Sequence, residues 1–225
     1  MHATWEPWMR LDAGAVDIPK TLLMGCNGGV VIGCENLCVH LMLAAGSFTQ
    51  WGDLSADDWA VHIAGWTRPL TPPSLVNAKV NGRLSLVPYE IGCGELDESS
   101  VQRLRHVLNA SPEGDHLVGA VNGVPVSVAL LDSGAERLAR AGNRLVASRK
   151  RINEKSIDAE LIGNWGEPDL VVACGPPNRS IPSLVWELAY SEIVYLGSPW
   201  RDVDSRALDQ AIRAFHNRNR RFGGV

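Results

Sequence analysis

Short apolar segments alternate with longer amphipathic ones along most of the chain. The apolar segments are typical of strands buried inside a sheet and comprise Thr21–Met24, Leu84–Val87, Val124–Leu131 and Asp169–Ala173. The amphipathic segments are typical of helices and comprise Glu35–Ala45, Ala56–Gly65, Ser99–Asn109, Ala135–Arg149, Ser156–Asn164, Ser183–Val194 and Ser205–Arg220. Because strands that alternate with helices usually form parallel sheets, we predict a single α/β domain with a central, mostly parallel sheet flanked by helices.

Capping and turn residues mark the ends of several of these segments. Asp97–Ser100 and Asp204-Ser205 supply side chains that cap the helices after them. Pro69–Pro73, followed by Asn81-Gly82, indicates a loop and a hairpin inside the domain. No repeat or low-complexity linker divides the chain.

Composition and charge narrow the class of protein. Of the 225 residues, 45% are hydrophobic and 20% are charged, which is ordinary for a folded protein and excludes a disordered chain. The net charge of -4 argues against a general nucleic-acid binder. The charge is uneven, because residues 201–225 hold six Arg and three Asp, against 15 Lys and Arg and 22 Asp and Glu in the rest of the chain. A basic tail therefore follows an acidic body.

Hydropathy and cysteine usage give an expected location. No apolar run reaches the roughly 18 to 20 residues that a membrane-spanning helix needs. The N-terminus has no basic region ahead of an apolar stretch, so we predict no signal peptide and expect a cytoplasmic protein. The five cysteines are odd in number and scattered, which favours reduced thiols. Cys34 and Cys38 have the spacing of two metal ligands on a helix, but without a second pair we interpret them as buried structural thiols.

A glycine-rich turn, Met24–Gly29, follows the first predicted strand. In α/β folds ligands bind at the carboxyl ends of the strands, where free backbone N–H groups can hold an anion. The turn could therefore cradle a phosphate, although glycines required by the turn itself explain it equally well. It is not the G-x-G-x-x-G fingerprint of dinucleotide-binding proteins.

A more specific pattern occupies the last third of the chain. The segments that carry it are, in order, Asp169–Val172, Arg179-Ser180, Trp186–Glu192, Trp200 and Arg218–Gly224. Together they resemble the C-terminal part of the cis-prenyltransferases, the family of undecaprenyl diphosphate synthase. In the same register, Met24–Gly29 resembles the family's M-D-G-N-G-R loop and Leu54–Trp59 resembles its F-S-T-E-N-W segment.

The resemblance covers roughly residues 18–224, so we treat 1–17 as an N-terminal extension and 18–225 as a cis-prenyltransferase-like domain. It implies a dimer, of identical or different subunits, with a hydrophobic tunnel. It also implies the condensation of isopentenyl diphosphate with an allylic diphosphate, assisted by Mg²⁺. An allylic carbon–oxygen bond ionises only if the departing charge is stabilised, so the metal, Arg side chains and backbone N–H groups are the expected catalysts.

Several charged residues that the resemblance implies are replaced in this chain. The family's loop Asp and loop Arg fall at Gly25 and Gly29, and two further Arg residues and a Glu fall at Ala135, Ala173 and Pro177. Replacing carboxylate and guanidinium groups removes the charges that bind a diphosphate and its metal. We therefore assign no catalytic residue to this chain.

Other residues of the pattern are kept. The resemblance assigns diphosphate binding to Asn27, Gly28, Ser55, Arg179, Arg221 and Gly223, and it leaves Glu192 as a candidate metal ligand. In the family, the C-terminal R-x-G reaches across the dimer to the partner's isopentenyl diphosphate site. Loss of the front half of the site with retention of the tail resembles the Nogo-B-receptor type of subunit. This implies a degenerate subunit that pairs with a catalytic one, which would hold most of the Mg²⁺ ligands.

Simpler roles remain open for the same residues. Arg179 could form a surface ion pair with Glu187 or Asp169, and Glu192, on the predicted helix Ser183–Val194, could be structural. Trp186, Tyr190 and Trp200 are most simply aromatic residues of the core or of a dimer interface. At the level of function, a diverged enzyme that condenses or cyclises prenyl diphosphates and a stand-alone isoprenoid-binding protein are the two alternatives.

Overall fold

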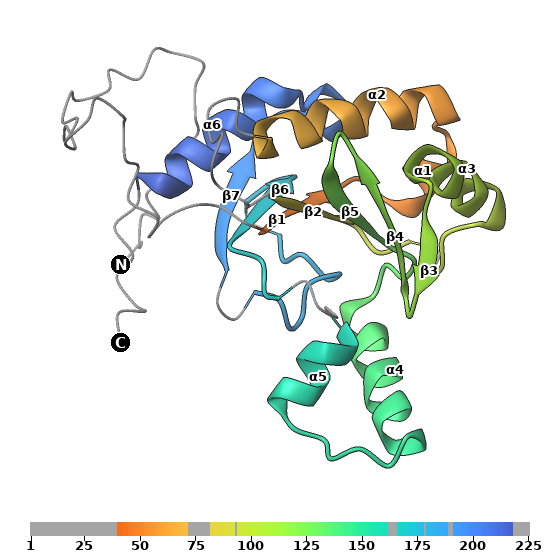
Figure 1. Cartoon of the computed structure of the whole chain (residues 1–225). Helices are drawn as coiled ribbons and strands as arrows, with labels where there is room; N and C mark the ends of the chain where they lie inside the picture. Colours follow the sequence, from red (N-terminus) through yellow and green to blue (C-terminus); the bar gives the residue numbers. More distant parts are fainter. Residues whose placement is uncertain are drawn as a thin grey trace, which may run out of the picture. The chain divides into compact units, whose positions relative to one another are not determined.

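The computed structural model describes residues 40–71, 82–92, 94–161, 166–177, 179–188 and 191–217. These residues form one sheet with helices packed around it (Figure 1). The elements are β1 (His40–Ala45), α1 (Phe48–Gly52), α2 (Ala56–Thr67), η2 (Arg68–Leu70), β2 (Arg83–Val87), α3 (Glu98–Leu108), β3 (Ser111–Glu113), β4 (His116–Val121), β5 (Val124–Ala129), α4 (Gly134–Ala147), α5 (Glu154–Leu161), β6 (Leu170–Cys174), β7 (Glu192–Leu196), η4 (Trp200–Asp202) and α6 (Ser205–His216).

The sheet has seven strands in the order β3-β4-β5-β2-β1-β6-β7. Five neighbouring strands, from β5 to β7, pair in parallel, whereas β3 and β4 are antiparallel. Strand β1 lies inside the sheet, where Ala44 is in register with Val87 of β2 and Ala173 of β6. The predicted α/β domain with a mostly parallel sheet is confirmed.

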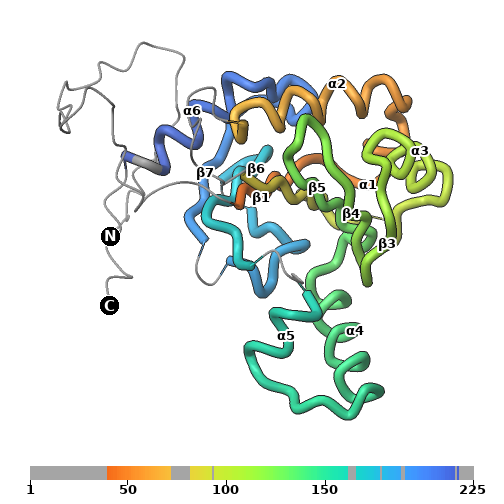
Figure 2. Tube along the Cα trace, in the orientation of Figure 1, coloured from red at the N-terminus to blue at the C-terminus, as the bar shows by residue number. Residues whose placement is uncertain are grey.

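One face of the sheet is covered by α1, α2, α3 and α6, which Figures 1 and 2 show packed side by side along it. The core on this side combines alternate strand residues such as Leu41 and Leu43 with three fully buried tryptophans, Trp51, Trp59 and Trp66. The indole N–H of Trp66 donates a hydrogen bond of 2.7 Å to the carbonyl of Val203, which joins α2 to the start of α6. Large aromatic side chains therefore fill the space between sheet and helices.

The opposite face has a smaller core and different cover. Met42 and Ala44 point to this side, where they meet Ile181 and Leu184 of the segment between β6 and β7. Helices α4 and α5 form a hairpin that projects from the body (Figures 1 and 2) and has its own small core of Ala141, Leu145, Ile157 and Leu161. Among the described residues, no helix is long and apolar enough to cross a membrane.

Polar side chains fix the beginnings of the helices. Asp97 caps α3 through the N–H of Ser100, and Asp204 caps α6 through the N–H groups of Arg206 and Ala207, as predicted. Hydrogen bonds from both serines that follow Asp97 lower the pKa of its carboxyl group to about 2. These helices therefore begin where the sequence indicates.

Two predicted helices are wrong. Part of Glu35–Ala45 is strand β1, and Ser183–Val194 gives turns up to residue 188 and then β7. All six residues of β1 are buried, and a short run that is apolar on every side does not distinguish a buried strand from a helix. The second segment ends in Ile193-Val194 and is followed by Tyr195, and such β-branched and aromatic residues favour a strand.

The hairpin predicted at Asn81-Gly82 is also wrong, since β2 pairs in parallel with both neighbours. The hairpin lies instead at Asn122-Gly123, between β4 and β5, where φ values of 54° and 76° match the tight turn that Asn-Gly favours. The strand predicted at Thr21–Met24 lies outside the described residues.

Replacement of glycine by alanine should have opposite effects on stability at Gly119 and at Gly142. A Cβ atom at Gly119 of β4 would lie 2.3 Å from the carbonyl oxygen of Leu108, whereas one at Gly142 of α4 would contact nothing within 4 Å. We expect Gly119→Ala to destabilise the fold by about 1–3 kcal/mol through overpacking. Gly142→Ala should stabilise it by about 0.5–1 kcal/mol because alanine suits a helix interior better. Urea unfolding of both variants tests this, and a neutral Gly119→Ala would contradict the β4–α3 packing.

Candidate functional site

The carboxyl ends of the parallel strands meet at one edge of the sheet. The loops after β1, β2 and β6 are hydrogen-bonded to one another there. The carbonyl of Gly46 accepts from the N–H groups of Tyr89, at 2.8 Å, and Glu90, at 3.0 Å. The Tyr89 hydroxyl donates to the carbonyl of Pro176 at 2.8 Å. Hydrogen bonds therefore join the loops at this carboxyl edge, which is where ligands bind in α/β folds.

Aromatic rings lie directly against the backbone at this edge. A Cβ at Gly175, just after β6, would lie 2.3 Å from the ring of Tyr89, so only glycine permits this contact. Beyond β7, the indole N–H of Trp200 donates to the side-chain oxygen of Gln50 at 2.9 Å. The loops after β1, β2, β6 and β7 are thus held in fixed positions.

Arg179 lies at the carboxyl edge, and its guanidinium is 3.3 Å from the Glu90 carboxylate. The partner is neither of the two carboxylates expected from the sequence, because Glu187 binds Arg137 instead. The side chains of Arg179 and Glu90 are 66% and 49% exposed, so the ion pair is weak and both groups remain accessible. Arg179 is therefore available to an anionic ligand.

The positions where the family resemblance implies further charges are apolar in the described part of this edge. Ala173 is fully buried in β6, and Pro177 and Ala135 lie in the loop after β6 and in the first turn of α4. Asp132, three residues before Ala135, is buried and accepts hydrogen bonds from the N–H groups of Gly92 and Gly94. It fixes a loop there.

Two other predicted site residues lie away from Arg179. Glu192 begins β7 in register with Leu170 at the start of β6, which places it at the amino edge of the sheet. Ser55 is exposed and caps α2, where its side chain and that of Asp58 form a reciprocal capping box. A second Ser-x-x-x-Trp segment, Ser47–Trp51, directly follows β1 and thus lies at the carboxyl edge. Asn27, Gly28, Arg221 and Gly223 lie outside the described residues, as do Gly25, Tyr190 and the pair Cys34 and Cys38.

A magnesium site does not fit the described residues. They contain no group of three His, Cys, Asp or Glu side chains that could hold a metal ion. Glu192 begins β7 at the amino edge, whereas Arg179 follows β6 at the carboxyl edge, so the two side chains do not form one site within the described part of this chain. Burial raises the pKa of the Cys174 thiol to about 12, which leaves it protonated and unreactive at neutral pH.

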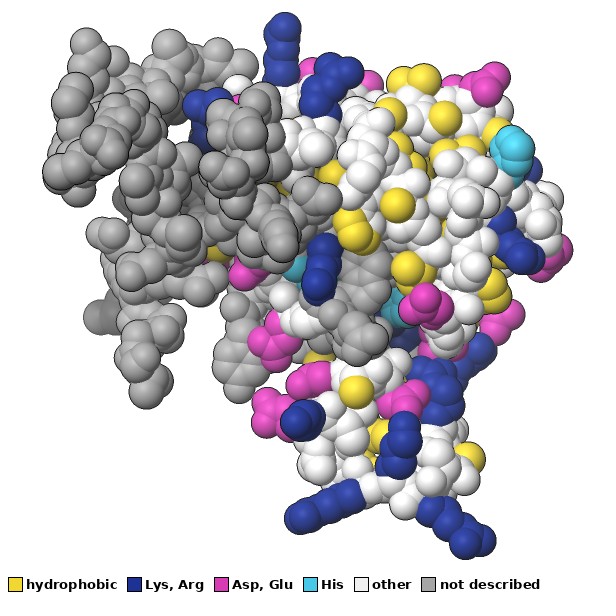
Figure 3. All heavy atoms as spheres, viewed as in Figure 1, with side chains coloured by type: hydrophobic (Ala, Val, Ile, Leu, Met, Phe, Trp, Pro, Cys, Tyr) yellow, Lys and Arg dark blue, Asp and Glu magenta, His cyan; other side chains and the backbone are white. Residues whose placement is uncertain are grey.

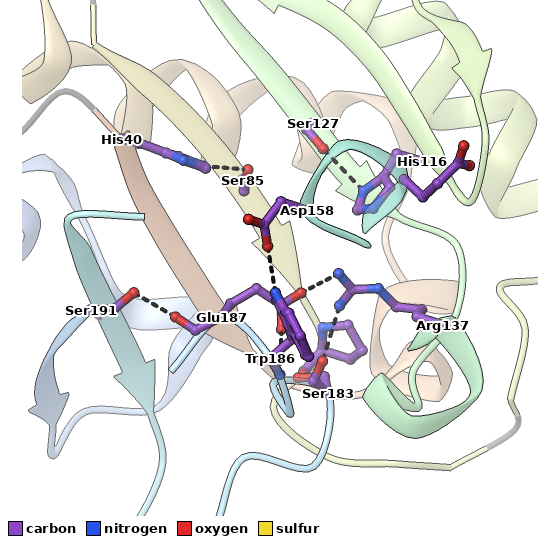
Figure 4. Close-up of polar contacts among 12 residues, drawn as sticks. His40, Ser85, His116, Ser127, Arg137, Asp158, Ser183, Trp186, Glu187 and Ser191 are labelled. Atoms are coloured by element: carbon purple, nitrogen blue, oxygen red, sulfur yellow. Dashed lines mark hydrogen bonds and ion pairs between the residues drawn. The ribbon is translucent and has the colours of Figure 1, made fainter. Parts of the chain in front are cut away.

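A cavity of about 370 Å³ lies between the sheet face and the α4–α5 hairpin, lined by both apolar and polar side chains. Its polar lining includes Ser85, Ser127, His116, Arg137, Arg144 and Glu187. Figure 4 shows two Ser–His pairs on neighbouring strands, with 2.8 Å between Ser85 Oγ and His40 Nε2 and 3.1 Å between Ser127 Oγ and His116 Nδ1.

The charges around this cavity are largely compensated. Arg137 and Glu187 form a buried ion pair, and Arg137 also donates to the carbonyl of Ser183 at 3.0 Å (Figure 4). Arg144 binds Asp115 at 2.8 Å and Glu160 at 3.0 Å. Burial, and then the charge of Arg137, lowers the pKa of His116 to about 3, so its imidazole is neutral at physiological pH. The cavity therefore offers neutral donors and acceptors rather than net positive charge.

Polar residues at buried positions are the feature of the sequence that could have indicated this cavity. Ser85 and Ser127 are single hydroxyl residues between apolar neighbours in β2 and β5, and parallel pairing puts them directly opposite each other. Arg137 lies on the buried side of α4, where an apolar residue is usual. Polar residues at buried positions point to compensating partners, but the partners themselves depend on the fold.

Fold and site together define an α/β protein with a carboxyl-edge site that keeps one accessible Arg. A sequence model of the family described as “Putative undecaprenyl diphosphate synthase” matches residues 99–223, more than half of the chain. The chain belongs to this family, the cis-prenyltransferases.

Individual relatives agree with this assignment. An isoprenyl transferase of Neisseria meningitidis serogroup B is 33% identical over 121 residues, which are 53% of this chain and 49% of the relative. One from Prochlorococcus marinus is 29% identical over 192 residues, 78% of this chain and 71% of the relative. The chain thus spans about half the length of the Neisseria relatives that it matches.

Solved structures show the same fold. A probable undecaprenyl diphosphate synthase from Campylobacter jejuni superposes with a TM-score of 0.53 at 16% identity, covering 84% of this chain and all of the other. Lavandulyl diphosphate synthase from Lavandula x intermedia, in complex with dimethylallyl diphosphate, gives 0.52 at 15% identity, covering 81% and 96%.

The Arg137–Glu187 pair predicts a large effect of removing one partner. Glu187→Gln leaves the Arg137 charge buried without its counter-ion, and we expect a loss of about 3–5 kcal/mol in unfolding free energy. Glu90→Gln, which breaks the exposed pair with Arg179, is the matched control and should cost less than about 1 kcal/mol. The double variant Arg137→Met/Glu187→Leu should be less destabilised than Glu187→Gln. Equal effects of the two single variants in urea unfolding would refute this.

The low pKa of His116 predicts a pH-dependent stability. In the folded protein the imidazole stays neutral down to about pH 3, whereas in the unfolded chain it takes up a proton below about pH 6.5. Its contribution is therefore complete above pH 6.5 and is lost as pH falls toward 3, by at most about 1.4 kcal/mol per pH unit. Unfolding free energies measured from neutral to mildly acidic pH should fall less steeply in His116→Asn. A slope unchanged in that variant would argue against burial of a neutral imidazole.

Proposed function

We propose that this chain is a degenerate cis-prenyltransferase subunit that pairs with a catalytic subunit and supplies Arg221 and Gly223 to the partner's isopentenyl diphosphate site. The observation that carries this proposal is the carboxyl edge, where Ala173 and Pro177 stand at positions that the family resemblance assigns to charged residues. Arg179 is kept there, paired only with an exposed Glu90.

The chemistry explains why such an edge is unsuited to catalysis on its own. Ionisation of an allylic diphosphate leaves a highly charged leaving group, which needs several cations or a metal to stabilise it. One Arg next to a carboxylate supplies little net positive charge. A partner with the intact Asp loop would supply the metal site and the allylic diphosphate site.

The relatives support isoprenoid diphosphates as the substrates of the assembled enzyme. The curated relatives are named isoprenyl transferases. The Arg-rich tail, Arg218–Gly224, lies within or next to the matched region 99–223 and resembles the family's tail. A subunit that keeps the tail while losing the loop charges is suited to complete a partner's site.

Reconstitution tests the proposal. The chain alone, given Mg²⁺, isopentenyl diphosphate and an allylic diphosphate, should form no product above background. Mixed with a family member that has the intact Asp loop, it should co-purify and raise product formation. Arg221→Ala should reduce that rate at least about tenfold without releasing the partner, because one charge-assisted contact to a diphosphate is lost. Arg213→Ala, in exposed ion-paired surroundings on α6, is the matched control and should leave the rate unchanged. Turnover by the chain alone at ordinary rates would contradict the partner role.

A diverged enzyme for condensation or cyclisation of prenyl diphosphates is the second candidate. The accessible guanidinium of Arg179 favours it, since this group could bind a diphosphate without a partner. This candidate predicts turnover by the chain alone that Arg179→Ala abolishes. Full activity of that variant would exclude this candidate, and absence of turnover by the chain alone would favour the partner role.

A further inference from the structure

The free end of the α4–α5 hairpin is a basic surface with two exposed apolar side chains. We define the hairpin tip as residues 146–155, from the last turn of α4 to the first turn of α5, all ten of which are exposed. It contains Arg149, Lys150, Arg151 and Lys155 against Glu154, a net charge of +3 in a chain whose total is -4. Figure 3 shows Lys and Arg side chains extending from this lobe into solvent.

Arg149 stands where the backbone favours glycine. Helix α4 ends in hydrogen bonds from Arg149 N–H to Val146 and from Lys150 N–H to Leu145, each at 3.0 Å, the pattern of a Schellman cap. Arg149 adopts the left-handed backbone conformation, with φ of 54°. This conformation costs free energy for any residue with a Cβ atom. Folding therefore does not explain an arginine here, and strain retained at one residue points to a function of its side chain.

The other basic residues are also not explained by the hairpin itself. Lys155 lies in the first turn of α5, where the helix dipole disfavours a cation. Of the four basic tip residues, Lys150 alone has a carboxylate within 4.0 Å among the described residues, Glu160 at 3.7 Å. The charges of Arg149, Arg151 and Lys155 thus face solvent instead of offsetting acidic groups of the fold.

Two aliphatic side chains lie among these charges. Val146 is 63% exposed and Ile152 is 54% exposed, which costs hydrophobic free energy while the tip is in water. Basic residues around exposed aliphatic ones suit a lipid surface, where cations meet anionic headgroups and apolar side chains enter the interface. A polynucleotide would use the charges but not Val146 and Ile152, and the like charges of two tips would repel each other.

We propose that the hairpin tip binds the surface of an anionic lipid bilayer. The tip is the free end of a hairpin that projects from the body, so it can approach a flat surface (Figure 1). Binding would be peripheral and electrostatic, and would weaken as salt screens the charges. This inference goes beyond the proposed function, since it does not depend on whether the chain is catalytic.

Vesicle flotation of the full chain tests the proposal. The protein should float with vesicles of phosphatidylcholine and phosphatidylglycerol and stay behind with phosphatidylcholine alone. Arg149→Gly and Arg151→Gln should each reduce the partition coefficient about fivefold, since one basic residue near an anionic surface contributes about 1 kcal/mol. Ile152→Ser should also reduce the partition coefficient, because it removes an apolar side chain that would enter the interface. Because glycine suits the backbone at 149, Arg149→Gly should melt no lower than the parent chain, which separates loss of binding from loss of folding.

Arg105→Gln/Arg206→Gln is the matched control, with two charges removed from exposed positions of α3 and α6. It should bind as the parent does. Equal binding to both vesicle types, or no effect of the tip variants, would overturn the proposal. So would tip-dependent binding of duplex DNA without vesicle binding, or a tip-dependent molar mass in light scattering, which would make the tip an interface between copies.

Discussion

Parallel pairing of β1 with β2 on one side and β6 on the other is the interaction on which the rest of this structure depends. All six residues of β1 are buried, and the strand contributes alternate side chains to the cores of both faces. Since parallel strands end at the same edge, this pairing brings together loops that lie more than 120 residues apart in sequence. The carboxyl-edge site exists because of it, and so does the separation of Glu192 from Arg179.

Charge is distributed in this molecule differently from what the family resemblance implies. The carboxyl edge, where the family resemblance places diphosphate binding, is poor in charge. Arg137 and Arg144 lie instead at the sheet face next to α4 and α5, and carboxylates bind both of them. Those arginines organise the base of the α4–α5 hairpin and the segment before β7. Charge that serves structure in this way is not free to serve a substrate, which accords with a subunit that completes another protein's site.

Much of the fold followed from local patterns, because caps and amphipathic helices are encoded within a few residues. Asp97 and Asp204 fixed the starts of α3 and α6, and the helices near α2, α4 and α5 were correctly placed. His40–Ala45 was misassigned because burial on both sides removes the periodicity that identifies a strand. The site was harder to predict. Motif order identified the family and made Arg179 a candidate residue. Its contact with Glu90, the pairing of Ser85 with Ser127 and the Arg137–Glu187 ion pair all join residues that only the fold brings together.

Helix α4 sets the distance between the carboxyl edge and the hairpin tip. Its 14 residues begin next to Asp132 at the carboxyl edge and end at the hairpin tip, a rod about 21 Å long at 1.5 Å per residue. Two contacts fix the first turns of α4 to the segment before β7. Arg137 forms an ion pair with Glu187, and the N–H of Gly134 donates to the carbonyl of Pro182. A surface bound at the tip would consequently lie at a stand-off of roughly the length of α4 from the carboxyl edge.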